Sequence, residues 1–283
     1  MSTPQSERER FRDQGYLLVE DCFDAEEVER MRGEADEILE LVVNASLAHG
    51  RKSGRLDIVE DDEGDQMVRK VQPVNDLSLA FSEVAEDDRV LDRLAAFMDD
   101  DPRLMEEKLN YKQPLPEPTP LEADRATSAF PVHNDWAYYK AQDYPQGVIS
   151  TAVLLDDFTA ENGPLHVWPG SHERHREHER VEGLGLQVPA DDLEGQGEDL
   201  LAPAGSVLFF HSLLVHSSRP NESGEPRRLM IYSHYPETEG EARGIVPDER
   251  NGPTRLRESP YEWAYQRRKE RGEVESRFEA PTY

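Results

Sequence analysis

Two side chains that can bind a metal ion stand two residues apart in the stretch Pro131-Val132-His133-Asn134-Asp135-Trp136. If this stretch is extended, residues two apart point to the same face, so His133 and Asp135 project side by side. An imidazole nitrogen and a carboxylate oxygen are two of the three ligands in the two-histidine-one-carboxylate set that binds non-haem Fe(II). Such His-x-Asp triplets are also common in loops that bind no metal, so a third ligand from elsewhere in the chain is needed.

Among the nine histidines, His216 is the strongest candidate for the third ligand. It ends the apolar run Leu213-Leu214-Val215, and a polar side chain at the end of a barrel strand can point into the mouth. The alternative is a core histidine whose ring is satisfied by hydrogen bonds. Arg227 begins the next predicted strand, and a hairpin would return it beside His216, where its planar guanidinium can bind a carboxylate through two hydrogen bonds.

A second histidine cluster consists of His172, His175 and His178, spaced three residues apart. The cluster lies in a run of Glu and Arg that is typical of an exposed helix face. We interpret it as solvated surface rather than as a metal site, because spacing without structural context is a weak signal.

The first hundred residues are predicted to be mainly helical. Asp24 and Glu27 have the spacing of a capping box, and Phe23 and Val28 have that of a hydrophobic staple, so a long helix is expected to begin at Asp24. A short strand is expected within residues 14–21, before this helix, and one or two helices between residues 77 and 98.

After about residue 109 the sequence breaks into short apolar strands separated by turns. We expect strands at 109–112, 148–155, 165–168, 206–210, 213–216 and 228–235, and a Pro-rich loop at 114–120. The charged segment from about 173 to 203 is expected to leave the core. This pattern is typical of an all-β barrel or sandwich. We expect a single domain (1–283) with a helical buttress region (1–108), a β core (109–240) and a C-terminal extension (241–283).

The chain carries a formal charge of −28, from 60 acidic and 32 basic residues, and the acidic residues are spread along its length. Only six of the basic residues are lysines. A dispersed carboxylate surface with few lysines is typical of halophilic proteins from a salt-rich cytosol, where ions screen the repulsion between like charges. The alternative is an ordinary acidic protein. In both cases nucleic acid is an unfavourable partner.

Cysteine content and hydropathy bear on the compartment. Cys22 is the only cysteine, which excludes an intramolecular disulfide and a cysteine metal cluster. Residues 2–14 are polar and lack the apolar segment of a signal peptide, and no apolar run approaches the length that crosses a membrane. We therefore expect a cytoplasmic protein without a membrane partner. The sequence does not indicate an oligomeric state.

Two basic islands interrupt the acidic sequence, at Arg51–Arg55 and at Arg69–Lys70. The simpler interpretation is that both lie in solvated loops, because most charged side chains are exposed. The alternative is a rim that binds anions near a substrate pocket.

Several short motifs together resemble the phytanoyl-CoA dioxygenase family of Fe(II)/2-oxoglutarate-dependent oxygenases. In family order, over about residues 11–235, they are Gly15-Tyr16, the strand before Lys112, His133-Asn134-Asp135, Asn162-Gly163-Pro164-Leu165, Pro169-Gly170-Ser171-His172, Ala204-Gly205 with Phe210, and His216 through Asn221 to Arg227. Each motif is weak alone, but the ordered set is specific.

The resemblance implies a fold and a ligand set. The fold is a mainly β double-stranded β-helix (a cupin-like jelly roll) with a helical buttress. The implied Fe(II) ligands are His133, Asp135 and His216, and Arg227 is the implied clamp for the far carboxylate of 2-oxoglutarate. Further implied co-substrate residues are Ser218, Lys112 and Asn134, the last standing where many members have glutamine.

The implied reaction is hydroxylation of a C–H bond in a small-molecule substrate by O2, while 2-oxoglutarate becomes succinate and CO2. Asp135 favours hydroxylation over halogenation, because related halogenases lack this carboxylate. Trp136, Tyr138, Tyr139 and Trp168 can line a substrate pocket, although aromatic residues beside a strand also serve as core. The first three of these depart from the pattern of ectoine hydroxylases.

Two other functions use the same residues. A non-catalytic metal- or ligand-binding barrel would keep the ligand set, but Arg227 would have no carboxylate to hold. A zinc-dependent hydrolase can use three such ligands with an open position. It would also need a general base beside the metal, and the sequence offers no obvious glutamate for that role.

Overall fold

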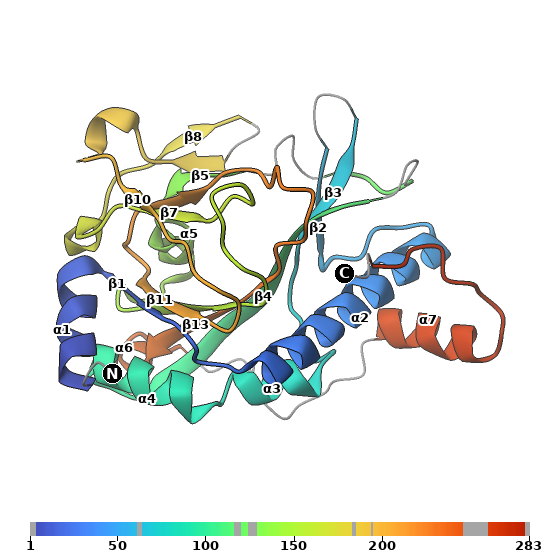
Figure 1. Ribbon diagram of the computed structural model, residues 1–283, viewed down its shortest axis with the longest axis horizontal. Coiled ribbons are helices and arrows are strands. Elements are labelled where there is room, and N and C mark those ends of the chain that lie inside the picture. The colour runs from blue at the N-terminus through green and yellow to red at the C-terminus, as the bar shows by residue number, and fades with distance from the viewer. Residues whose placement is uncertain are drawn as a thin grey trace.

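Two antiparallel sheets form the body of the protein in the computed structural model, and helices cover the outer face of the larger sheet (Figure 1). The structure describes residues 4–60, 64–115, 120–123, 129–182, 185–193, 195–245 and 260–280. Most of the expected Pro-rich loop, residues 116–119, lies outside these ranges. No helix in the described ranges is both long and apolar enough to cross a membrane.

The larger sheet has seven strands in the order β1-β11-β6-β13-β4-β3-β2. In that order they are Tyr16–Val19, Val207–His211, Ile149–Leu154, Leu229–Pro236, Pro102–Pro114, Gln66–Val71 and Leu56–Glu60. The smaller sheet has the order β10-β7-β12-β5, with bounds Glu198–Asp199, Leu165–Val167, His216–Ser218 and Phe130–His133. A separate hairpin pairs β8 (Glu179–Val181) with β9 (Gly185–Gln187).

The helices are α1 (Pro4–Gln14), α2 (Ala25–His49), α3 (Leu79–Val84), α4 (Asp88–Met98), α5 (Trp136–Tyr139), α6 (Glu237–Ala242) and α7 (Pro260–Glu270). Single 3-10 turns occur at Lys140–Gln142, Ser171–Glu173 and Ala190–Asp192.

The central strands are buried on both faces, because each face packs against a different layer. On β11, Phe209 packs into the cluster shared with the helices, whereas Phe210 packs into the cluster between the two sheets. On β13, Met230 and Ile231 divide in the same way. Side chains alternate between the two faces of a strand, so these near-continuous apolar runs supply both the helix-facing core and the wall of the inter-sheet space.

Helix α2 begins as its sequence predicts. The Asp24 side chain accepts from the backbone N–H of Glu27, and the Glu27 side chain accepts from the Asp24 N–H, each at 2.9 Å. This reciprocal capping box satisfies two of the N–H groups that a helix leaves unpaired. On the buried face, the Tyr111 hydroxyl of β4 donates to the Ala35 carbonyl at 2.7 Å, which ties the helix to the strand that passes beneath the inter-sheet space.

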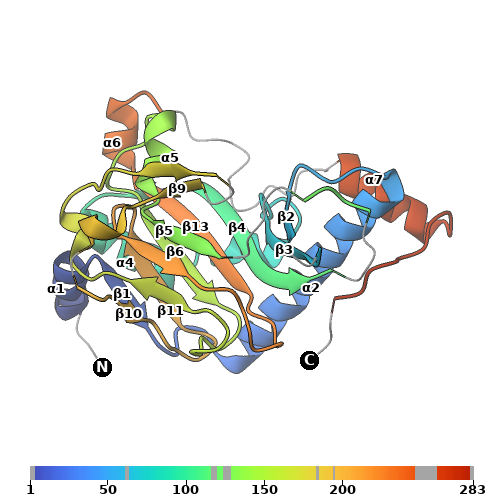
Figure 2. The ribbon, with the colours of Figure 1, turned by 90° about the horizontal axis from the view of Figure 1, so that it is seen from above.

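The C-terminal segment packs along α2 (Figure 2). The buried Asn44 donates through Nδ2 to the Phe278 carbonyl at 2.7 Å and accepts through Oδ1 from the N–H groups of Arg277 and Phe278. Helix α7 lies beside the same helix. The C-terminal extension therefore joins the helical layer, at a distance from the smaller sheet.

The structure corrects the prediction for the second basic island, whereas residues 51–55 lie in a loop with Arg51 exposed. Residues 56–60 and 66–71 form a hairpin that extends the larger sheet, so Arg69 and Lys70 lie in β3 rather than in a solvated loop. Arg69 is 2 % exposed and pairs with Asp57. Arg55 forms a bidentate pair with Asp76 at 2.7 and 2.6 Å, so it belongs to the buttress. The hairpin escaped prediction because its short strands carry many charged residues.

The charged segment 173–203 also differs from expectation. It contains no α-helix in its described part, and β8, β9 and β10 form instead. The Val188 N–H donates to the Val132 carbonyl of β5 at 2.8 Å, so the segment, which we call the charged flap, is docked on the smaller sheet. The three histidines of this region therefore do not form an exposed helix face.

Candidate active site

Strand pairing brings two of the predicted metal ligands together. β5 and β12 are antiparallel neighbours, and His133 and His216 are direct cross-strand partners whose ring centroids are 4.4 Å apart. Directly opposed residues of an antiparallel pair share one face of the sheet. His216 begins β12 rather than ending the preceding apolar run, which forms the turn before it. The pairing, which sequence spacing cannot reveal, is what joins positions so far apart in the chain.

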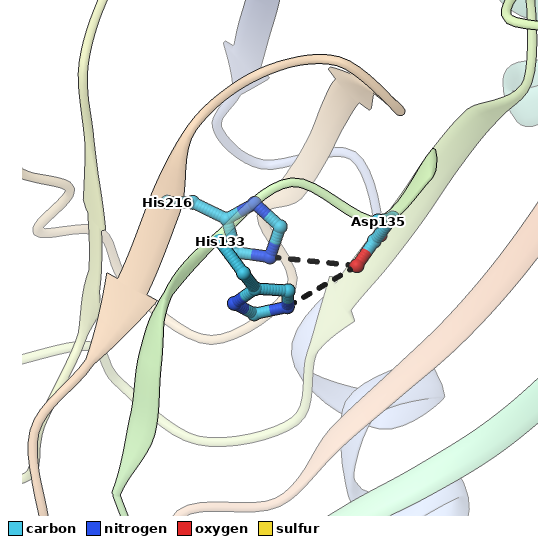
Figure 3. Close-up of side chains that lie close together, drawn as sticks. All are labelled: His133, Asp135 and His216. Atoms are coloured by element: carbon cyan, nitrogen blue, oxygen red, sulfur yellow. Dashed lines mark ion pairs between the residues drawn. The ribbon is translucent and has the colours of Figure 1, made fainter. Parts of the chain in front are cut away.

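Asp135 reaches the same point through a turn. The strand ends at His133, and Asp135 has helical backbone angles (φ −64°, ψ −32°) as the N-cap of α5. The extended conformation that the sequence suggested for the whole stretch is therefore wrong after His133. The turn brings Asp135 Oδ1 to 3.4 Å from His133 Nε2 and 3.7 Å from His216 Nε2 (Figure 3).

Backbone carbonyl groups orient both imidazole rings. His133 Nδ1 lies 2.7 Å from the Pro131 carbonyl, and His216 Nδ1 lies 3.0 Å from the Leu214 carbonyl. A carbonyl oxygen can only accept, so each Nδ1 carries the proton and each Nε2 presents a lone pair toward Asp135. Metal-binding histidines are usually held by such a second hydrogen bond.

Electrostatics keep His216 and Asp135 in the protonation states that a metal requires. Burial and the neighbouring His133 lower the pKa of His216 to about 4, so its ring is neutral near pH 7. Burial alone raises the pKa of Asp135, but His216, His133 and Lys108 outweigh it and hold this pKa below its ordinary value. The three donor atoms lie within 4.8 Å of one another, and no other such group occurs in the described residues. Asp135 Oδ1 lies 3.4 and 3.7 Å from the two ring nitrogens, less than twice a metal–ligand distance of about 2.1 Å, so the residues fit a metal.

The three side chains open into a cavity between the two sheets. Its wall contains eight apolar residues of both sheets and their connections: Phe130, Ala152, Phe158, Leu165, Leu208, Phe210, Leu229 and Ile231. Its other members are Lys108, Asn110, His133, Asp135, His216, Ser218 and Arg227. A mostly apolar cavity with a few convergent polar groups is the usual form of a small-molecule site.

Arg227 is a buried cation with unused hydrogen-bond capacity. It is 1 % exposed, its guanidinium lies over the Phe158 ring at 4.6 Å, and no ion pair to it occurs in the described residues. Its Nε has no hydrogen-bond partner in the same residues, and burial lowers the pKa of Arg227 to about 10. A buried charge is costly unless it is paired, so this guanidinium fits an anionic partner that enters the cavity.

The route by which Arg227 reaches the cavity differs from the predicted hairpin. It lies just before β13 in the larger sheet, whereas His216 begins β12 in the smaller sheet. The two residues therefore approach the cavity from facing sheets. The jelly-roll arrangement produces this proximity, because consecutive strands alternate between its two sheets.

Ser218 and Lys112 are bonded to each other at one end of the cavity. Lys112 Nζ donates to Ser218 Oγ at 3.1 Å and to the Gly163 carbonyl at 3.5 Å, and it also donates to the Arg219 carbonyl. Ser218 lines the cavity, whereas Lys112 does not. Burial and the nearby Arg227 lower the pKa of Lys112 to about 6.

Asn134 does not line the cavity, and its contacts outside its own turn are with the charged flap. Its backbone N–H donates to His178 Nε2 at 3.1 Å, and its Nδ2 lies 3.5 Å from His175 Nδ1. His178 Nδ1 lies 2.8 Å from the Arg176 carbonyl, so Nδ1 carries the proton and Nε2 accepts. The flap thus holds the residue that separates two of the candidate ligands.

None of the four aromatic candidates lines the cavity either. Trp136 packs edge-on against His175 with ring centroids 4.7 Å apart. The Tyr138 hydroxyl accepts from a flap N–H, and Tyr139 is buried with its hydroxyl donating to Glu106 at 3.0 Å. Trp168 packs against His166. In this structure these rings are packing and docking residues.

Sequence reasoning missed Lys108 and Asn110, which line the cavity from β4. The signal was present: Glu106, Lys108, Asn110 and Lys112 alternate with residues that face the helices. Polar residues at every second position mark one face of a strand. The sequence analysis placed only the end of this run in a strand.

Comparisons with known proteins agree with this geometry. Residues 11–229 match the family model described as Phytanoyl-CoA dioxygenase (PhyH). The chain is 26% identical over 235 residues to a Halomonas elongata protein named Ectoine dioxygenase, in a match that covers 77% of this chain and 65% of that protein. It is 24% identical over 237 residues to a Stutzerimonas stutzeri protein named Probable alpha-ketoglutarate-dependent hypophosphite dioxygenase, covering 81% of this chain and 77% of that protein.

A solved structure shares the fold. The crystal structure of EctD from S. alaskensis with bound Fe superposes with a TM-score of 0.62 at 22% identity, covering 84% of this chain and 78% of that one. The likeness confirms the expected cupin-like jelly roll, and at this identity it speaks to the fold alone.

Proposed function

The chain belongs to the phytanoyl-CoA dioxygenase family, and on that premise we propose that it is an Fe(II)- and 2-oxoglutarate-dependent dioxygenase that hydroxylates a C–H bond of a small molecule. The observation that carries the proposal is the convergence of His133, Asp135 and His216 in one cavity with the buried, unneutralised Arg227. This set offers both a metal site and a counter-charge for an acid bound to the metal.

In this proposal His133 Nε2, Asp135 Oδ1 and His216 Nε2 hold Fe(II). Bound Fe(II) with 2-oxoglutarate supplies the activation of O2 and the oxidation of the substrate, with succinate and CO2 as co-products. Arg227 binds the far carboxylate of 2-oxoglutarate. Its planar fork matches a carboxylate through two hydrogen bonds, which fixes the co-substrate's orientation as well as its affinity.

The remaining residues position the reactants and exclude water. Ser218, at the end of β12, helps to hold the co-substrate, and Lys112 of β4 positions the Ser218 side chain. Asn134 acts through the flap rather than through the cavity. The apolar wall excludes bulk water, which protects reactive species from side reactions and strengthens interactions with charged groups. We propose that residues 1–283 act as one oxygenase domain, since one buried cluster includes residues from Phe11 to Ala280.

The two alternative functions fit the cavity less well. A zinc hydrolase needs a general base beside the metal, and Asp135 is the only carboxylate among the described residues that line the cavity. A non-catalytic binding barrel would leave Arg227 buried without a purpose for its charge. The acidic composition further suggests that the protein is halophilic and works in a salt-rich cytoplasm, on a small-molecule substrate with O2.

One experiment tests the proposal. Purified protein is supplied with Fe(II), ascorbate and 2-oxoglutarate under O2, and succinate is measured with and without candidate substrates. We expect iron-dependent succinate release that is abolished in Asp135→Ala. Hydrolysis that requires zinc but not 2-oxoglutarate would favour the hydrolase, and failure of the protein to bind 2-oxoglutarate in the presence of Fe(II) would refute the oxygenase.

A further inference from the structure

A group of lysines lies on the inner face of the larger sheet, beside the candidate metal site. Three of the six lysines in this acidic chain, Lys70, Lys108 and Lys112, lie on the adjacent strands β3 and β4. Lys112 is engaged by Ser218 and backbone carbonyls. Lys70 and Lys108 have no role in the function proposed above, so their charge requires another explanation.

Irregular pairing on both sides of β3 accompanies the placement of Lys70. Lys70 pairs with Asp57 and Val68 with Ile58, so Arg69 is an extra residue relative to β2. Lys70 also pairs with Asn110 and Val68 with Gln113, so on that side the extra residue belongs to β4. Asn110 in turn pairs with Leu229. Cross-strand partners share a face, so Lys70 lies on the same face as Asn110 and Leu229, both of which line the cavity. Bulges commonly re-aim side chains next to functional sites.

Apart from Asp135, which the proposed function assigns to the metal, the charges on this face do not balance. Lys108 Nζ donates to Glu106 Oε1 at 2.9 Å, Gln72 Nε2 donates to Glu106 Oε2 at 3.0 Å, and Lys70 Nζ donates to Gln72 Oε1 at 3.2 Å. Glu106 therefore contacts Lys108 directly and Lys70 only through Gln72, and in the described residues Lys70 forms no ion pair. Arg69 and Asp57 form a neutral pair next to them.

Both lysines are cationic near neutral pH. Burial and the neighbouring Lys108 lower the pKa of Lys70 to about 8. Burial also acts to lower the pKa of Lys108, but Glu106 and Asp135 raise it above its ordinary value. The excess positive charge therefore persists under the conditions in which an enzyme would work.

Asn110 adds unused hydrogen-bonding capacity at the same place. It is 6 % exposed, lines the cavity, and its Oδ1 has no hydrogen-bond partner in the described residues. No described residue bonds to its Nδ2 either. The Nδ2 group can therefore donate to a ligand in the cavity, whereas Oδ1 is an acceptor and does not bind an oxyanion.

We propose that Lys108 and Asn110, supported by the field of Lys70, form a subsite for an oxyanion of the substrate, a carboxylate or a phosphonate. Ammonium and amide N–H groups are donors that suit charged oxygen acceptors. The proposal deepens the proposed function and rests on it, because Arg227 is taken by 2-oxoglutarate and the second cationic region is left for the substrate. Of the two basic islands in the sequence, only Arg69–Lys70 takes part.

The test uses small anions and neutral analogues of similar shape. The anions are acetate and methylphosphonate, and their neutral analogues are acetamide and dimethyl methylphosphonate. Each compound is titrated into the protein with Fe(II) and saturating 2-oxoglutarate, under anaerobic conditions at constant ionic strength. Calorimetry gives affinities and thermal unfolding gives the stabilisation. We expect at least one anion to bind about tenfold or more tightly than its neutral analogue, and the preferred anion identifies the oxyanion type.

Matched lysine variants locate the effect. Lys108→Gln and Lys70→Gln each remove one ammonium group and are expected to weaken anion binding by about tenfold while leaving the neutral analogues unchanged. Lys269→Gln, on α7, is the control with the same charge change and should behave as wild type. If Lys108→Gln does not fold, Lys70→Gln carries the test.

The possible failures are distinguishable. Fe(II) and 2-oxoglutarate binding are measured first, and the probe titrations are repeated on metal-free protein. Absence of Fe(II)-dependent 2-oxoglutarate binding counts against the proposed function. Three results would overturn the subsite alone, provided that 2-oxoglutarate binds normally. No anion binds, anions and neutral analogues bind equally, or the preference for anions is intact in both lysine variants.

Discussion

Two buried ionisable side chains, Arg227 and Glu107, allow specific predictions about ligand binding and stability. Arg227 and Glu107 are each 1 % exposed, and both lie next to or within the sheet that forms the cavity wall. Arg227 faces the cavity, whereas Glu107 faces the buttress and accepts the N–H groups of Val74 and Asn75. Their different surroundings predict different behaviour on substitution.

Replacing Arg227 with methionine should separate co-substrate binding from stability. Arg227→Met removes a buried cation that has no ion pair in the described residues, so the protein without 2-oxoglutarate should be at least as stable as wild type. Affinity for 2-oxoglutarate should fall by about tenfold to a hundredfold, because a hydrogen-bonded charge pair is lost. Calorimetry with Fe(II) and with 2-oxoglutarate measures both affinities.

The matched control is Arg243→Met, which removes an exposed arginine paired with Asp143. It should leave both affinities unchanged. Equal loss of Fe(II) and 2-oxoglutarate binding in Arg227→Met would mean that the clamp has been assigned to the wrong residue.

Glu107 should make stability depend on pH. Burial raises the pKa of Glu107 to about 7, above the value of about 4.3 in an unfolded chain. The folded state therefore binds this proton more tightly, and the associated stability is present below about pH 4.3 and is lost as the pH rises through 7. Glu107→Gln has no such loss, so relative to wild type it should gain about 3 kcal/mol between pH 4 and pH 8. Urea unfolding across this range gives the difference, and a difference that does not vary with pH would refute the assignment.

Among the elements, the charged flap has the most direct connection to the candidate metal site. Its hydrogen bonds reach Val132 before the ligand segment, Asn134 within it and Tyr138 after it. Hydrogen bonds before, within and after this turn restrict the conformation of its backbone. Since Asp135 reaches the site through this turn, we expect the flap to influence how well the ligands are preorganised.

His178→Phe should weaken Fe(II) binding without unfolding the protein. The variant keeps a ring that can stack on His175 but has no acceptor for the Asn134 N–H. Loss of such an outer hydrogen bond typically weakens metal binding by about tenfold. Fe(II) titration measures the affinity, His178→Gln should restore part of it because its side chain can accept, and His49→Phe on α2 is the remote control. Unchanged Fe(II) affinity in His178→Phe would show that the flap does not position the ligands.

At the scale of the whole molecule, negative charge dominates the surface while the site is locally cationic. The chain carries −28 in total, yet four cations, Arg69, Lys70, Lys108 and Arg227, gather near or line the cavity. A locally cationic site inside an acidic surface concentrates anionic ligands at the site. The surface itself should destabilise the fold at low ionic strength through self-repulsion.

Salt should therefore stabilise the protein. The Debye length falls from about 10 Å at 0.1 M to about 3 Å at 1 M salt, which removes most repulsion between separated surface carboxylates. We expect the Tm to rise by several degrees over this range of KCl, as measured by calorimetric scans. A parallel series in sucrose separates screening from general solvent exclusion. A Tm that is flat or falls with KCl would argue for an ordinary acidic protein.

Local sequence was sufficient for the features set by neighbours in the chain. The capping box at Asp24, the buried strand β6 and the two short helices between residues 77 and 98 depend on nearby residues and on the alternation of apolar side chains, and all are present. The ordered motifs also indicated the family and its jelly roll, which the family match and the solved structure confirm. The β2–β3 hairpin was missed because charged residues masked its alternation.

Only the tertiary structure decided which distant residues meet. The register of β12 against β5 sets His216 opposite His133, the facing sheets bring Arg227 to the same cavity, and the pairing of β3 with β4 puts Lys70 on the cavity's side of the sheet. The cavity wall includes residues of β4, β6, β11 and β13, and the four aromatic candidates lie outside it. Which strands pair, and in which register, depends on the total burial of apolar surface in the folded chain. A short stretch of sequence therefore does not determine it.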